Sequence, residues 1–136
     1  MRSTPLLIPI SLAALTAACG GYDNTAPAGD NLPDQPGGNP VQSATVDVRD
    51  NQFVPNSVNL VSGGTVTWTW SGNNHDLAPV GTPTFSPTAS IENAGFTLGP
   101  VTFSQAGTFR YRCTVHSSID AYGGLSGMTG VVFVQP

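Results

Sequence analysis

The sequence contains no lysine, and charged residues make up only 9% of its 136 positions. Four arginines stand against eight acidic residues, which gives a formal net charge of -4. Proteins that bind nucleic acid neutralise phosphates with clustered Lys and Arg, so this composition disfavours nucleic-acid binding. The phosphate-binding loop of nucleotide hydrolases needs a Lys before its Ser or Thr, so that function is excluded as well.

Cysteine, histidine and methionine are scarce, with two of each. One of each lies in the stretch FRYRCTVHSSIDAYGGLSGMTGVVFV, which runs from Phe109 to Val134. A thiolate, an imidazole and a thioether close together are typical ligands of a soft metal ion. The alternative is a buried Cys, an exposed loop His and a Met that fills the core.

The N-terminus has the pattern of an export signal, with Arg2 and then a mostly apolar run from Leu6 to Leu15 that is too short to span a membrane. The following TAAC, which ends at Cys19, resembles the lipobox of bacterial lipoproteins, although that family usually has an aliphatic residue where this chain has Thr16. The resemblance implies a signal peptide over residues 1–18 and lipid on Cys19. Such a protein would be exported and anchored at the periplasmic or extracellular face of a membrane. Ordinary cleavage that leaves a free thiol is the alternative.

Residues 19–43 are predicted to be the lipid-bearing Cys and a linker. They are rich in Gly, Pro, Asn and Asp and show no apolar periodicity, which is typical of a disordered tether. The remainder, residues 44–136, is long enough for one hydrophobic core and too short for two domains of ordinary size. We therefore expect a single folded domain there.

Apolar and polar residues alternate through much of this domain. The alternating apolar positions are Val46, Val48, Val58, Leu60, Val66, Trp68 and Trp70. This period of two indicates half-buried strands, and turns are predicted at Gly63-Gly64 and near Ala106-Gly107. The segment from about Phe85 to Asn93 leaves room for a short helix. The pattern as a whole predicts an all-β domain, an antiparallel sandwich or barrel.

Cys113 is the residue on which a metal site would depend. In TFRYRCTV it shares the apolar face of a strand with Phe109 and Tyr111, so its side chain should point inward. If Cys19 carries lipid, Cys113 has no disulfide partner within the chain, which points to burial, reactivity or metal binding. His116 follows three residues later, and His75 lies in a loop after the Trp70 strand that a sandwich can bring to the same end.

The segments GGTVTWTWSGNNHDL, AGTFRYRCTVH and GMTGVVFV resemble the small blue-copper cupredoxins of the plastocyanin and pseudoazurin type. The resemblance covers about residues 44–136 and implies a Greek-key antiparallel β-sandwich that binds one copper ion. It also implies that His75, Cys113 and His116 are the equatorial ligands and that Met128 is the axial ligand.

Two departures from the family pattern concern the surroundings of the ligands. Eleven residues separate His116 from Met128, whereas in the family the Met usually follows the second His within about three to five positions, so the ligand loop is enlarged. Asp76 stands where plastocyanins commonly have an Asn that links the two ligand loops. Asp76 and Thr114 are accordingly expected beside the ligands.

The resemblance implies a monomeric electron carrier that cycles between Cu(I) and Cu(II) and serves exported redox partners such as cytochromes, oxidases or reductases. In this family electrons commonly pass through the C-terminal His, here His116, so the enlarged loop beside it is expected to shape partner docking. Three alternatives stay open: a copper-delivery module with a mobile loop at Gly123-Gly124 and Gly127, an enzyme with an open copper position and Asp120 as a substitute ligand, and a metal-free sandwich that binds other molecules.

Overall fold

The computed structural model describes residues 32–136. The expected signal peptide, the lipid site at Cys19 and most of the predicted linker lie outside the described residues. The described chain forms seven strands: β1 (Val41–Arg49), β2 (Gln52–Val54), β3 (Ser57–Trp70), β4 (Ala78–Val80), β5 (Thr97–Phe103), β6 (Gly107–Ile119) and β7 (Leu125–Gln135). None of these residues forms a helix that is long and apolar enough to cross a membrane.

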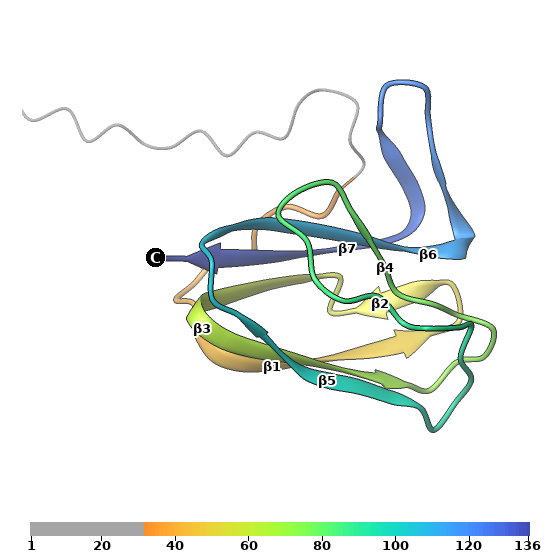
Figure 1. Ribbon diagram of the computed structural model, residues 1–136, viewed down its shortest axis with the longest axis horizontal. Coiled ribbons are helices and arrows are strands. Elements are labelled where there is room, and N and C mark those ends of the chain that lie inside the picture. The colour runs from red at the N-terminus through yellow and green to blue at the C-terminus, as the bar shows by residue number, and fades with distance from the viewer. Residues whose placement is uncertain (1–31) are drawn as a thin grey trace, which may run out of the picture.

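Strand β3 connects the two layers of the sandwich because it belongs to both (Figure 1). Its first part, Ser57 to Val61, pairs with β7, and its second part pairs with β1 and β5. Gly63 between them adopts a φ of 82°, and a Cβ on Gly64 would lie 2.9 Å from the carbonyl oxygen of Val61. The turn expected at Gly63-Gly64 is therefore a bend within one continuous strand.

The direction of two strand pairs corrects the expectation of a purely antiparallel sandwich. Along the path β2-β1-β3-β7-β6-β4, β3 runs parallel to both β1 and β7, whereas the other pairs are antiparallel. Alternation of apolar residues reports which face of a strand is buried and carries no information on the direction of its neighbour. The all-β sandwich class is confirmed, with mixed pairing.

The core between the layers is aromatic. Trp68 and Tyr111 are fully buried, and their rings meet edge to face with centroids 5.6 Å apart. Phe53, Phe103 and Phe109 pack around them. All seven alternating apolar positions predicted from the sequence are buried here, which confirms the inward face of each strand. Cys113 belongs to the same buried cluster, so this packing fixes the part of β6 on which it lies.

The segment after β4 forms a loop, so the helix considered between about Phe85 and Asn93 is wrong. Phe85 stacks on Trp68 with ring centroids 5.4 Å apart. Two residues of the loop are hydrogen-bonded to the segment that follows β3. Thr88 bonds to the backbone of Leu77, and the backbone of Glu92 pairs with that of His75. These contacts hold the segment against the residues that follow β3, in an irregular conformation without a helical turn. Strand β1 starts at Val41, three residues before the domain boundary predicted at residue 44.

Candidate metal centre

His75 is fixed by its backbone in the loop that follows β3. Its N–H donates to the carbonyl of Glu92 at 3.0 Å, and the N–H of Glu92 donates back at 2.8 Å. The indole N–H of Trp70 donates to the carbonyl of His75 at 3.1 Å. Three hydrogen bonds thus fix the backbone of His75. Because only 1% of the residue's surface is exposed, the surrounding side chains also restrict its imidazole.

Cys113 and His116 lie on β6 where its pairing with β7 is interrupted. The register shifts between Arg112 and Ser117, and the Ser117 hydroxyl donates to the carbonyl of Cys113 at 2.5 Å. Cys113 is fully buried, as its place on the apolar face predicted, whereas His116 is partly exposed. The interruption bends the chain and turns the His116 ring toward the Cys113 sulfur.

Three donor atoms converge at this end of the sandwich. Nδ1 of His75 lies 3.1 Å from Nδ1 of His116, and Sγ of Cys113 lies 3.8 Å and 3.5 Å from these two nitrogens. Nitrogen ligands about 2.0 Å and a sulfur about 2.3 Å from a common ion would stand roughly 3 to 4 Å apart. The residues therefore fit one metal ion. The structure brings the three expected equatorial ligands together.

The hydrogen bonds and the thiol of the cluster determine what a metal ion must displace. Oδ1 of Asp50 lies 3.4 Å from Nε2 of His75, and in the tautomer in which Nε2–H donates to this carboxylate the lone pair is on Nδ1. Burial raises the pKa of the Cys113 thiol, an effect that backbone N–H groups of Asp76, His116 and Val115 partly offset. A metal ion must therefore displace a proton from Cys113 when it binds.

Asp76 ties the two ligand segments to each other. Its Oδ1 accepts the backbone N–H of Thr114 at 2.6 Å, and its Oδ2 accepts the Thr114 hydroxyl at 2.5 Å. Asp76 adjoins His75 and Thr114 adjoins Cys113 in the sequence. Asp76 and Thr114 thus lie beside the candidate ligands, as predicted, and the Asp76 carboxylate accepts both hydrogen bonds from Thr114.

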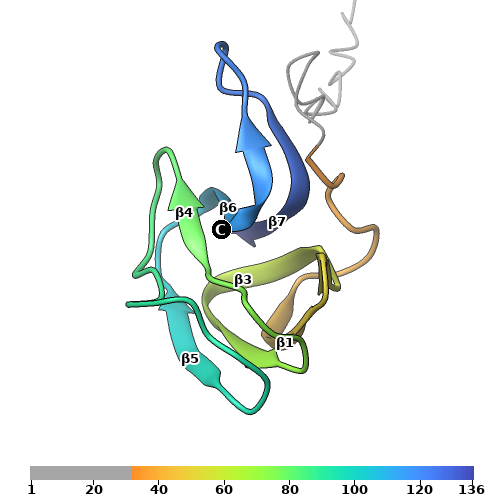
Figure 2. The same cartoon turned by 90° about the vertical axis from the view of Figure 1, so that its right-hand side faces the viewer.

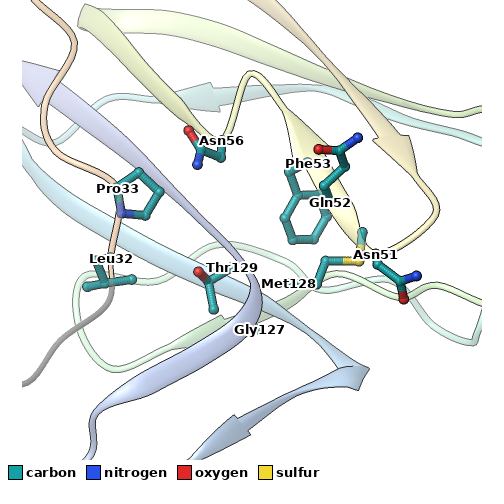
Figure 3. A pocket seen from close by; sticks show the side chains of 9 residues that line it. All are labelled: Leu32, Pro33, Asn51, Gln52, Phe53, Asn56, Gly127, Met128 and Thr129. Atoms are coloured by element: carbon teal, nitrogen blue, oxygen red, sulfur yellow. The ribbon is translucent and has the colours of Figure 1, made fainter.

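Met128 is buried beside the same bend, with 1% of its surface exposed. Its neighbour Thr129 pairs with Arg112, so Met128 and Cys113 flank one rung of the β6–β7 ladder. Figure 3 shows Met128 beside Phe53 at the wall of a cavity of about 230 Å³. Met128 is thus placed near Cys113, and axial ligation by its thioether stays a prediction.

Asp50 and Gly72 support the site and were not predicted from the sequence. Asp50 follows β1, and a Cβ on Gly72 would lie 2.6 Å from the backbone nitrogen and Oδ1 of Asp50. Gly72 therefore gives Asp50 the room to approach His75. An Asp in a turn has many structural roles, and only the packing of β1 against the His75 loop reveals this one.

No model of a protein family matches the sequence, and neither does any curated protein. Solved structures do match. They include a copper-containing nitrite reductase from Thermus scotoductus (TM-score 0.53, 20% identity), a pseudoazurin from Sinorhizobium (0.51, 21%) and a reduced mutant of amicyanin (0.50, 20%). The matches cover 69%, 71% and 69% of this chain, and 22%, 76% and 83% of the respective structures.

The match to the nitrite reductase spans less than a quarter of that chain, so it concerns one part of the larger protein. The pseudoazurin and the amicyanin are matched over most of their length. At these identities the likeness shows a common fold. The chain therefore has the cupredoxin fold, with His75, Cys113 and His116 as a candidate copper site at one end of the sandwich.

Proposed function

We propose that this chain is an exported, membrane-tethered type 1 copper protein that carries single electrons between redox partners. The observation that carries the proposal is the convergence of two imidazole nitrogens and one thiol at a buried end of a cupredoxin-fold sandwich. One thiolate with two imidazoles is the donor set of blue-copper centres. The matched nitrite reductase also contains copper.

Copper held by these residues supplies a one-electron couple, and the chain supplies a fixed set of ligands. Backbone hydrogen bonds with Glu92 and the indole N–H of Trp70 restrain His75, and the Asp76 carboxylate joins its segment to the Cys113 segment. Ligands that do not move when the charge of the ion changes allow fast electron transfer, since little of the protein has to reorganise. Burial of Cys113 keeps water from the sulfur.

The partly exposed His116 is the ligand through which electrons would enter and leave. The other two ligands have no exposed edge, because His75 is 1% and Cys113 is 0% exposed. Partners would therefore be exported redox proteins, such as cytochromes, that approach the His116 side. Export and attachment through Cys19 rest on the N-terminal sequence pattern, and a mature protein whose mass shows no acyl groups would refute the lipid.

The test of the copper site is the visible and electron paramagnetic resonance spectrum after addition of Cu(II). We expect an intense copper–thiolate absorption in the wild type that is absent in Cys113→Ser. Cys19→Ser removes the other thiol of the chain and should keep the band. A wild-type chain without a thiolate band would refute the proposal and leave a sandwich with a buried thiol.

A further inference from the structure

The enlarged ligand loop forms an ordered hairpin, here called the arm, from Ser117 to Gly127. Its strands pair in register at Ser117 with Gly127, Ser118 with Ser126 and Ile119 with Leu125. At about 3.3 Å per residue the arm reaches roughly 13 Å from base to tip. Figures 1 and 2 show it rising from the β6–β7 layer away from the rest of the sandwich.

The turn at the tip is held by a single carboxylate. Oδ1 of Asp120 accepts the N–H groups of Tyr122 and Gly124, each at 2.8 Å, and the Asp120 N–H donates to the Gly124 carbonyl. Asp120 is the only charged residue of the arm, and its carboxylate is engaged by these two donors. The tip therefore carries a single negative charge, on a carboxylate that is hydrogen-bonded to the backbone of the turn.

Apolar side chains on this tip lie in solvent. Tyr122 is 98% exposed and Ile119 is 45% exposed, both among the few large apolar residues that the described chain leaves exposed. Tyr is enriched where proteins meet the headgroup region of a bilayer, because its ring is apolar and its hydroxyl is polar. A hairpin that exposes Tyr and Ile at its end and carries only one charge has the chemistry of a shallow contact with a zwitterionic membrane surface.

The start of the described chain lies at the base of the arm. Leu32 and Pro33 line one cavity together with Gly127 and Thr129 (Figure 3). Both ribbon views place these first residues on the side from which the arm rises. Thirteen residue steps separate Leu32 from Cys19 and span at most about 45 Å. A lipid on Cys19 would therefore keep the base of the arm within that distance of the membrane.

We propose that the tip of the arm rests in the interfacial region of the membrane and sets the orientation of the domain. This inference rests on the proposed attachment through Cys19, which raises the local concentration of a contact too small to bind by itself. The arm begins next to His116, so the copper end would stand about one arm length from the lipid. His116 would then face partners that lie in or on the same membrane.

The test compares two tryptophan variants of the lipid-bearing full chain in phosphatidylcholine vesicles whose acyl chains are brominated. Bromine quenches an indole that touches the acyl region, and the native Trp68 and Trp70 are shielded by burial. Tyr122→Trp places an indole at the tip. Thr97→Trp is the matched control, because Thr97 is exposed on β5 in the layer away from the arm (Figure 1).

We expect bromine to reduce the added emission of Tyr122→Trp at least about twofold more than that of Thr97→Trp. Ile119→Ser in the Tyr122→Trp background should weaken the quenching. Equal quenching of the two variants, or an unquenched Tyr122→Trp, would overturn the inference, and the second result would assign the tip to water or to a protein partner.

The failure of the inference can be told apart from failure of the proposed function. The copper–thiolate band reports the metal site in the same samples, and the mass of the chain reports the lipid. If the mass shows no lipid, the Cys19 thiol is coupled to a maleimide lipid and the quenching is measured again. The comparison of Tyr122→Trp with Thr97→Trp then tests the membrane contact of the arm with a synthetic anchor in place of the native lipid.

Discussion

The carboxylate of Asp50 lies 3.4 Å from Nε2 of His75, on the side of the imidazole opposite to the metal centre. The same Oδ1 accepts the backbone N–H of Asn73 at 3.2 Å, so the carboxylate contacts both the His75 ring and the loop that carries His75. A His that donates its second N–H to a carboxylate presents its other nitrogen in a fixed tautomer and direction. Asp50 thus orients His75 from outside the candidate metal centre.

Asp50→Ala should weaken copper binding about 10- to 100-fold, because the imidazole loses the partner that fixes its tautomer. Asp50→Asn should lose less, since the amide oxygen still accepts the Nε2 proton. Competition with a chelator of known affinity measures the effect. Asp34→Ala removes an exposed carboxylate from the N-terminal segment and should leave the affinity unchanged.

Gly72→Ala tests the same contact through the backbone. The added Cβ would lie 2.6 Å from Oδ1 of Asp50, so the carboxylate must move away from His75. The copper affinity should fall as it does in Asp50→Ala, and combining the two changes should add little. Fully additive losses would show that Gly72 acts on the fold and not through Asp50.

Asp76→Asn should raise the reduction potential of the copper centre. The substitution removes a negative charge next to His75 and Cys113, and less negative surroundings favour Cu(I) over Cu(II). The amide can still accept from the Thr114 N–H and donate to its hydroxyl, so the geometry should persist. Cyclic voltammetry measures the shift, for which a tenfold change in the equilibrium corresponds to about 59 mV. A potential equal to that of the wild type would contradict the role of the charge.

Met128→Leu distinguishes a ligand from a residue that only fills the core. The two side chains have similar volume, so the fold should be retained, while the thioether is lost. If Met128 ligates, the electron paramagnetic resonance parameters and the reduction potential change, and the copper–thiolate band remains. A variant with the potential and spectra of the wild type would show that Met128 is not a ligand.

Tyr111 connects folding to alkaline pH. Burial raises the pKa of its hydroxyl above the value of 10.0 that applies in the unfolded chain. The unfolded state therefore loses this proton first, and the free energy of unfolding should fall by about 1.4 kcal/mol per pH unit as pH rises above about 10. Tyr111→Phe should remove the part of this dependence that Tyr111 contributes when unfolding of the metal-free chain is followed in urea. The part contributed by the buried Cys113 thiol, whose pKa is also raised, should remain. Tyr122→Phe, at a side chain that is 98% exposed, should keep the whole dependence.

Much of the candidate site could be predicted from the sequence because Cys113 and His116 lie close together in one strand whose alternation is clear. Cys113 lies on the apolar face of an alternating strand, and His116 follows at a distance that a bend can close. Residues 44–136 contain one Cys and two His, so His75 could be proposed from its place in a loop at the end of a strand. The resemblance to cupredoxins supplied the role of each expected ligand and the position of Asp76 between the two ligand loops.

The parts that sequence could not supply depend on contacts between distant strands. Parallel pairing of β3 with β1 and β7 leaves no trace in the alternation of either partner. Asp50 meets His75 only because the end of β1 packs beneath the loop after β3. The sequence predicts the arm only as an enlarged loop, since two of its three strand pairs join Ser with Gly or with Ser, residues that do not favour strands.

Strand β3 has a consequence for when copper can enter the protein. Two of its pairings, with β5 and β7, join residues that are far apart in the chain, and such contacts form slowly because long loops must close first. His75 follows the end of β3, whereas Cys113 and His116 arrive with β6. The three candidate ligands therefore come together through strand pairings that span most of the described chain. Copper bound there would hold a chain in which both layers are already paired with β3, and would not organise a separate local segment.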